Sequence, residues 1–99
     1  MMLHIVNTEN YAPKVIANCL EYCNADDHLL LMGAAKFAVI QDSPVWHLAN
    51  NLSSLKIYVL ESWIKLVKSP NILLPNLRVI HYADFVDLVE LCDNNQTWN

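Results

Sequence analysis

The chain has 99 residues, with ten acidic against six basic side chains and a formal net charge of −4. Its Lys and Arg residues are scattered and form no basic stripe, which argues against autonomous binding to a nucleic-acid backbone. The single glycine, Gly33, excludes the glycine-rich phosphate loops of nucleotide-binding domains, and no apolar run reaches the length of a bilayer span.

The first third of the chain predicts a strand, a helix and a second strand. Residues 2–6 form a short apolar run with β-branched side chains, typical of a strand. Pro13 suits the first turn of a helix, and apolar residues recur at helical spacing over residues 12–23. The continuous apolar run 28–32 is typical of a parallel strand covered on both faces, and Gly33 should begin a turn after it.

The middle of the chain is less regular. Residues 34–40 and 45–53 are compatible with two short helices, separated by a turn that contains Pro44. Residues 55–60 are rich in β-branched and aromatic side chains and give the clearest strand in the sequence. A short helix over residues 61–67 is expected to follow it.

The last third predicts a strand over residues 77–81 and a helix over residues 82–92, followed by a polar tail over 93–99. Strands that alternate with helices, joined by connections too long for hairpins, indicate an α/β fold. We expect one domain spanning residues 1–99, with a mostly parallel sheet of four to five strands and helices on both faces, in flavodoxin-like layers.

Three cysteines without the spacing of a disulfide framework favour a reducing, cytoplasmic location, and no secretory leader is recognised at the start. Cys19 and Cys23 stand four apart on the predicted first helix, a spacing that could serve metal ligation, persulfide chemistry or redox exchange. A packing role is the simpler interpretation for both and for Cys92, because free cysteines often behave as small buried hydrophobes. The helix dipole should also disfavour a thiolate at Cys23.

The four histidines, His4, His28, His47 and His81, are isolated in sequence and have no H-x-x-x-H or C-x-x-C companion. We therefore expect neither a metal nor a cofactor, and expect the histidines to be packing or interface residues. His81 is the strongest exception, since it follows a strand and sites gather at the carboxyl ends of parallel strands.

Two features concern partners. Apolar residues make up 55% of the chain, including Trp46, Trp63 and Trp98, more than so small a core is expected to bury. This surplus predicts an oligomer. The acidic run of Asp84, Asp87 and Glu90 could meet a basic partner, although such a run is more often the solvated face of a helix.

Four segments together resemble one family, TusB/DsrH. They are the opening Met2-Leu3-His4, the segment Asn18-Cys19-Leu20, the strand Lys56-Ile57-Tyr58-Val59-Leu60, and the closing run from Tyr82 to Leu88 with Cys92, Asp93, Gln96 and Trp98. The closing run is the most telling, and the resemblance covers the whole chain in length and order. Met32-Gly33-Ala34-Ala35 departs from the acidic turn expected in that family.

The resemblance implies an accessory subunit of a sulfur-relay sulfurtransferase complex, a heterohexamer with TusC/DsrF-like and TusD/DsrE-like subunits. Such a complex passes persulfide sulfur to a TusE/DsrC-like acceptor, toward 2-thiolation of the tRNA wobble uridine in one branch and in sulfur oxidation in the other. Contact with tRNA would be indirect, and the isolated chain could self-associate. The main sulfur-carrying cysteine would belong to the TusD/DsrE-like partner.

Cys19 matches a first-helix cysteine found in some DsrH-like members, so it is the candidate catalytic residue, as a persulfide carrier. That role is the alternative to a purely structural subunit. A generic flavodoxin-like binding module is a third reading, which the lack of a glycine-rich loop disfavours.

Overall fold

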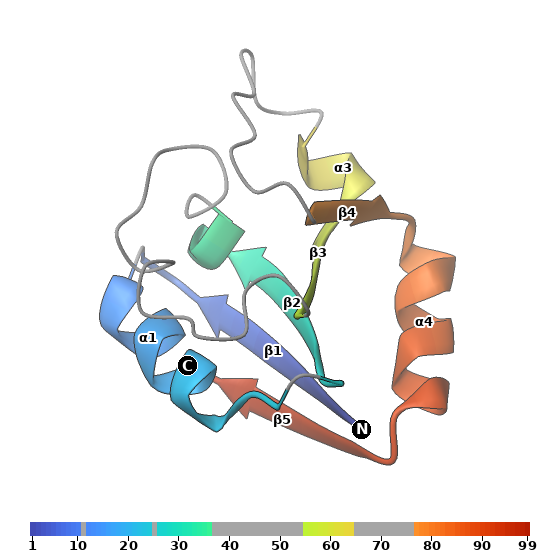
Figure 1. Cartoon of the computed structure of the whole chain (residues 1–99). Coiled ribbons are helices and arrows are strands. Elements are labelled where there is room, and N and C mark those ends of the chain that lie inside the picture. The colour runs from blue at the N-terminus through green and yellow to red at the C-terminus, as the bar shows by residue number, and fades with distance from the viewer. Residues whose placement is uncertain (11, 25, 37–54, 65–76) are drawn as a thin grey trace.

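A computed structural model describes residues 1–10, 12–24, 26–36, 55–64 and 77–99 of the chain. Five parallel strands form one sheet in the order β4-β3-β2-β1-β5, which confirms the predicted α/β class (Figure 1). The elements are β1 (Met2–Thr8), α1 (Pro13–Tyr22), β2 (His28–Gly33), the 3-10 turn η1 (Ala34–Lys36), β3 (Lys56–Leu60), α3 (Glu61–Ile64), β4 (Leu77–Ile80), α4 (Tyr82–Leu91) and β5 (Asn94–Trp98).

The strand order explains why α1 and α4 lie on opposite faces of the sheet. From β1 to β4 each new strand is added on the same side, whereas β5 returns to the far edge beside β1. Connections between parallel strands are right-handed, so reversing the direction of travel moves the connecting helix to the other face. Figure 1 accordingly shows α1 and α4 on either side of the strands.

Each face has its own hydrophobic core, and β1 contributes to both because successive side chains of a strand point in opposite directions. Leu3 packs with Leu88 and Cys92 under α4. Val6 packs with Ile16 and Cys19 under α1. His4 shares the parity of Val6, so its imidazole lies on the α1 side.

Most predicted elements are present within the described residues. The strands at 2–6, 28–32, 55–60 and 77–81 and the helices at 12–23 and 82–92 are confirmed with shifts of one or two residues at their ends. Of the helix expected at 34–40, residues 34–36 form a 3-10 turn. The rest of that segment, the helix expected at 45–53 and residues 65–67 lie outside the described residues, as do Trp46 and His47.

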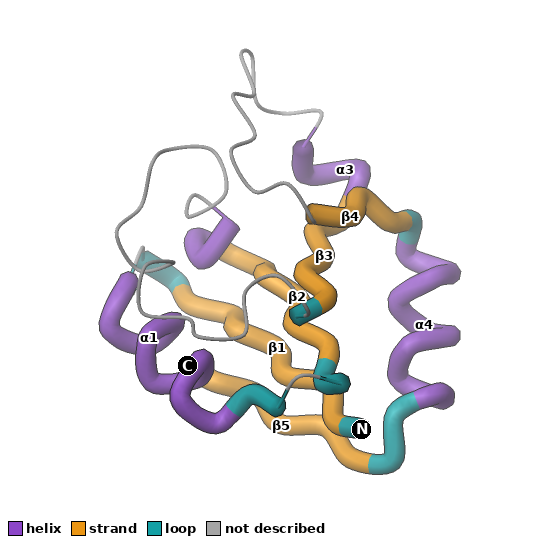
Figure 2. Tube along the Cα trace, viewed as in Figure 1, coloured by secondary structure: helices purple, strands orange, loops and turns teal. Residues whose placement is uncertain are grey.

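The polar tail contains a strand that the sequence did not single out. β5 runs beside β1 with Met2 opposite Asn94 and Val6 opposite Trp98, at the outer edge of the sheet (Figure 2). Its asparagines disfavour a strand, and it has no alternating apolar side chains to signal one. The backbone of β1 supplies the hydrogen-bonding partner instead, so the strand is defined by its neighbour more than by its own side chains.

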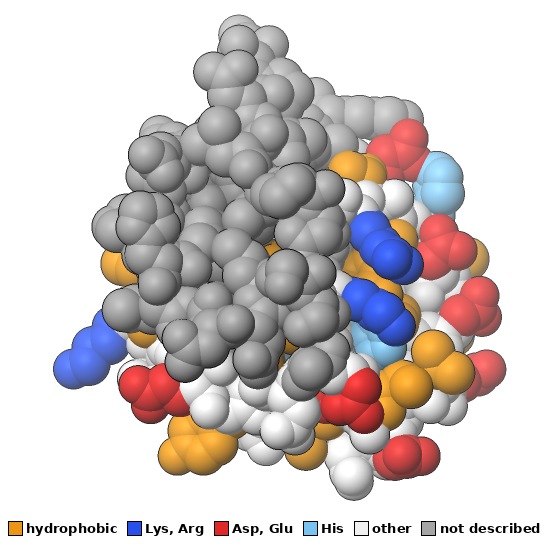
Figure 3. Space-filling view, viewed as in Figure 1, with side chains coloured by type: hydrophobic (Ala, Val, Ile, Leu, Met, Phe, Trp, Pro, Cys, Tyr) orange, Lys and Arg blue, Asp and Glu red, His pale blue; other side chains and the backbone are white. Residues whose placement is uncertain are grey.

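Acidic side chains follow α4 along the right-hand edge of the surface in Figure 3. Asp84, Asp87 and Glu90 are all exposed, as expected for the solvated face of a helix. None of the helices found in the described ranges is long and apolar enough to cross a membrane.

Gly33 ends β2 in a conformation that side chains rarely adopt. Its φ angle is +57°, and a Cβ atom placed there would collide with the backbone carbonyl oxygen of Thr8 on the adjacent strand. Glycine is therefore required for two reasons, the left-handed backbone and the close approach of β1.

We expect Gly33→Ala to lower the free energy of unfolding by at least ~1 kcal/mol, the cost of a left-handed L-residue, with the Thr8 clash added to it. Gly33→Asn separates the two causes, because asparagine tolerates positive φ but still carries a Cβ atom. Urea unfolding should show a loss of stability in both variants, and the loss should be smaller in Gly33→Asn because mainly the clash with Thr8 remains. Full recovery in Gly33→Asn would mean that backbone conformation alone, and not the approach of Thr8, requires the glycine.

Candidate functional site

The site begins with His4, whose imidazole is buried between two partners. Its Nε2 lies 3.0 Å from Oδ2 of Asp27, and the indole Nε1 of Trp98 donates to its Nδ1 at 3.2 Å. An indole N–H can only donate, so the lone pair of neutral His4 is on Nδ1. Nε2 then carries the proton and donates to Asp27, which fixes both the tautomer and the orientation of the ring.

Asp27 is held as a carboxylate by three donors. Besides His4, the backbone N–H of Met2 donates to Oδ1 and that of Asn24 donates to Oδ2, both at 3.0 Å. Burial alone would raise the pKa of Asp27, but the bonds from Asn24, His4 and Met2 outweigh it and the pKa lies below its usual value. This one side chain therefore joins the start of β1 to the segment between α1 and β2.

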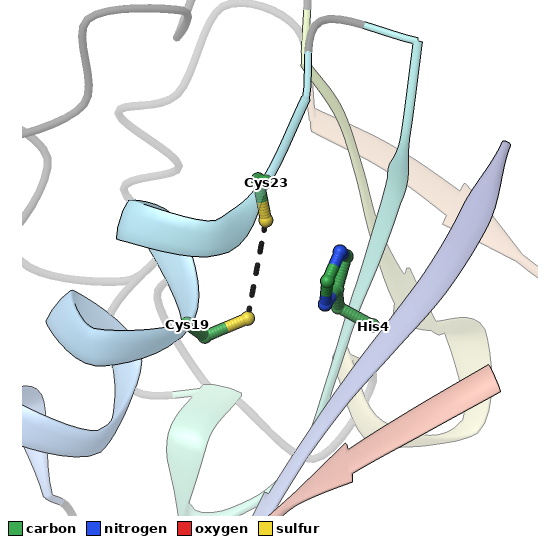
Figure 4. Close-up of side chains that lie close together, drawn as sticks. All are labelled: His4, Cys19 and Cys23. Atoms are coloured by element: carbon green, nitrogen blue, oxygen red, sulfur yellow. Dashed lines mark hydrogen bonds between the residues drawn. The ribbon is translucent and has the colours of Figure 1, made fainter.

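The first helix brings two cysteines to the same place. Cys19 and Cys23 are one helical turn apart, and their sulfur atoms are separated by 3.9 Å. Both side chains are buried, Cys19 completely, and none of the three cysteines is in a disulfide. Figure 4 shows the two sulfur atoms turned toward His4 from α1, across from β1.

The two thiols differ in their acidity. A hydrogen bond with Cys23, followed by burial, raises the pKa of Cys19. The same bond, with the help of His4 and against the effect of burial, lowers the pKa of Cys23 to about 6. The bond between the two sulfurs, in which either can be the donor, thus moves the two pKa values in opposite directions. The lowered pKa of Cys23 runs against the effect that the helix dipole was predicted to have there.

His4 is coupled to this thiol pair. Hydrogen bonding with Cys23, and then with Asp27, raises the pKa of His4 against the effect of burial. The indole N–H of Trp98 can donate to His4 only while Nδ1 is unprotonated. The potential ligand atoms of His4, Cys19 and Cys23 all lie within 4.8 Å of one another, close enough to share a metal ion.

A surface pocket leads to this cluster. It has a volume of about 320 Å³ and is lined by Met2, His4, Tyr22, Gln96 and Trp98. The rings of Tyr22 and Trp98 are 5.5 Å apart, and the centre of the Trp98 ring lies 6.2 Å from that of His4. His4 therefore has one side toward the pocket and another toward the buried thiols.

The two other histidines within the described residues lie elsewhere. His28 is buried, and its Nδ1 pairs with the hydroxyl of Tyr58 at 2.8 Å. Burial, then the charge of Lys56, lowers the pKa of His28, as expected for a neutral packing residue. His81 is exposed at the start of α4 and lies 2.6 Å from a carboxylate oxygen of Glu61. His81, the histidine that the sequence singled out as a site candidate, is thus the N-cap residue of α4 and is not part of the thiol cluster.

Sequence reasoning nominated Cys19 but did not connect it to the other members of the cluster. The four-residue spacing of Cys19 and Cys23 was visible in the sequence, and the structure brings them together. His4, Asp27 and Trp98 come from separate elements, and no spacing in the chain links them. The alternation along β1 could have placed His4 on the same face as Val6, but not beside α1. Cys92 packs under α4, where it was predicted to be core.

A family model described as DsrH-like protein matches residues 10–95. The chain belongs to the DsrH-like family. This confirms the resemblance stated from the sequence and makes the chain a subunit of a multi-subunit sulfur-relay system. No curated protein matches the chain. The matched range includes Cys19, Cys23 and Asp27 of the DsrH-like chain, whereas His4 and Trp98 lie outside it.

We expect Asp27→Asn to cost about 1–3 kcal/mol of stability at neutral pH, because the replacement amide mismatches the three donors. Since folding lowers the pKa of Asp27, its contribution is present above the ordinary carboxyl pKa and is lost as the pH falls through the folded-state value. Urea unfolding at neutral and acid pH should therefore show a difference from wild type that shrinks in acid. Asp26→Asn, at an exposed neighbour, is the control and should change little.

The metal-free reduced protein should show a thiolate titration with a midpoint of about 6 in its ultraviolet absorbance, owing to Cys23. Cys23→Ser should remove this step, and Cys19→Ala should move it to higher pH because the donor is gone. Cys92→Ser should leave it unchanged, since that thiol lies in the other core. If the titration step survives in Cys23→Ser, Cys23 is not the acidic thiol.

Proposed function

We propose that this DsrH-like chain is an accessory subunit of a TusBCD/DsrEFH-like complex in the cytoplasm. In this role it supports the transfer of persulfide sulfur toward 2-thiolation of the tRNA wobble uridine. The observation that carries the proposal is the environment of Cys19, which is fully buried and hydrogen-bonded to Cys23. A sulfur carrier must present its thiolate to a partner, and burial and a raised pKa both oppose that at Cys19.

Exposed apolar side chains support a role in assembly. Val79 on β4 and Tyr82, Val86 and Leu91 on α4 are all at least 43% exposed. Large apolar side chains left on a small protein favour contact with other subunits. The partners proposed are TusC/DsrF-like and TusD/DsrE-like subunits, two copies of each chain in a heterohexamer, with a TusE/DsrC-like acceptor downstream.

The acidic charge suits an indirect relation to tRNA. With a net charge of −4, the chain has little electrostatic attraction for a phosphate backbone. A relay subunit can serve tRNA modification without touching the nucleic acid, since the sulfur travels through protein persulfides.

The second candidate function is that of a persulfide carrier. It is favoured by the Cys23 thiolate, with its pKa of about 6, more than by Cys19, the residue nominated from the sequence. The burial of both sulfur atoms counts against the carrier role, because a partner protein could not reach them. Sulfur oxidation is the alternative branch of metabolism for either role.

The first test is affinity capture of the tagged chain from its native cells, followed by mass spectrometry of the intact complex. We expect two homologous small subunits in equal amounts with this one, and Cys19 and Cys23 without added sulfur. Recovery of the chain without partners would contradict the proposal that it is a subunit of such a complex. A persulfide on Cys19 or Cys23 would show that the chain carries sulfur itself and would contradict the accessory role.

The tRNA assignment needs its own measurement. Deleting the gene should lower the 2-thiouridine content of hydrolysed tRNA, and the wild-type gene should restore it. Unchanged 2-thiouridine together with impaired growth on reduced sulfur compounds would assign the chain to sulfur oxidation instead. Cys92→Ser should restore function as well as wild type and serves as the control for cysteine replacement.

A further inference from the structure

We infer that His4, Cys19 and Cys23 form a zinc-binding site between β1 and α1. This inference goes beyond the proposed function, since a sulfur-relay subunit does not require a metal. Two sulfurs and one imidazole nitrogen are a donor set that zinc favours, and the three ligand atoms already lie within 4.8 Å of one another. The ligands come from two elements that are far apart in the sequence, which is why the chain shows no metal-binding spacing.

The separation of the sulfur atoms fits a tetrahedral metal. Two thiolates bound to zinc at about 2.3 Å, at a tetrahedral angle, stand about 3.8 Å apart. Cys19 and Cys23 are 3.9 Å apart as the chain is folded. A disulfide would instead require the sulfurs to approach to about 2.05 Å. The arrangement thus suits a shared ion with little movement of α1.

The surroundings of His4 resemble the outer shell of a zinc ligand. Its Nε2 is bonded to the Asp27 carboxylate, as in carboxylate–histidine–zinc arrangements. Its lone pair is on Nδ1, which now accepts from the indole of Trp98. Ligation through Nδ1 would replace that indole and leave the Asp27 bond intact. Trp98 is partly exposed on an edge strand, so its side chain is the group that can yield.

Three protein ligands leave a fourth tetrahedral position open. Open positions are typical of zinc sites that take water or an external ligand. The pocket lined by Met2, Tyr22, Gln96 and Trp98 reaches His4 from the surface and gives such a ligand a route. Binding balances as one Zn²⁺ taking the imidazole of His4 and both cysteines as thiolates, with every proton that the two thiols still carry released to water.

Cobalt(II) is the probe, because its colour reports both sulfur ligation and tetrahedral geometry. We expect the reduced, metal-free full chain to bind one Co²⁺ with a thiolate-to-cobalt charge-transfer band and the strong visible bands of a tetrahedral ion. Zn²⁺ should bleach both. Excess Co²⁺ that gives no thiolate band with wild-type protein would overturn the inference without reference to any variant.

Variants then assign the ligands. Cys19→Ser and Cys23→Ser should each weaken or abolish the charge-transfer band, while Cys92→Ser, the matched buried cysteine, should leave it unchanged. Circular dichroism checks that each variant is folded. A band that survives both single replacements, or that disappears in Cys92→Ser, would place the metal elsewhere.

Two further variants test the roles of the neighbours. Asp27→Asn should weaken zinc binding by about 10–100-fold, as loss of an outer-shell carboxylate does. Trp98→Phe removes the competing donor, so it should bind zinc at least as tightly as wild type, a result that loss of folding could not imitate. Weaker binding in Trp98→Phe would overturn the assignment of Nδ1 as the ligand.

Discussion

The bond between Asp27 and His4 is the interaction on which the site depends. It joins a carboxylate at the start of β2 to the imidazole on β1, and the same carboxylate fastens the backbone at Met2 and Asn24. A buried charge is costly unless it is paired and hydrogen-bonded, and here three donors satisfy it. The end of α1 and the start of β1 are held together as a result, which brings the thiols to the histidine.

The two cysteines differ in pKa as a consequence of that arrangement. Their mutual hydrogen bond raises the pKa of Cys19 and lowers the pKa of Cys23, with help from the imidazole of His4 at Cys23. Sequence position alone put both on an apolar helix face and predicted that the helix dipole disfavours a thiolate at Cys23. Their difference arises first from the bond between them and then from His4 of β1, which lowers the pKa of Cys23 further.

Much of the fold could be predicted because its signals are local. Residues 56–60 identify themselves as a strand by their β-branched and aromatic side chains, and α4 by its helical period. β5 has no such signal, since its sequence NNQTW is defined as a strand by the free edge of β1. The site shares this property: Cys19 and Cys23 could be paired from their spacing, whereas His4, Asp27 and Trp98 meet only through the packing of separate elements.

The pairing of β1 with β5 has a consequence for biosynthesis. Residues 2–6 are synthesised well before their partners, residues 94–98. Until then one edge of β1 is without its neighbour, and His4 is without the indole of Trp98. A nascent chain would carry an open strand edge, close to two thiols, until residues 94–98 have been made. Unpaired edges invite association with other strands, so this is the interval in which chaperones or partner subunits would protect the chain most.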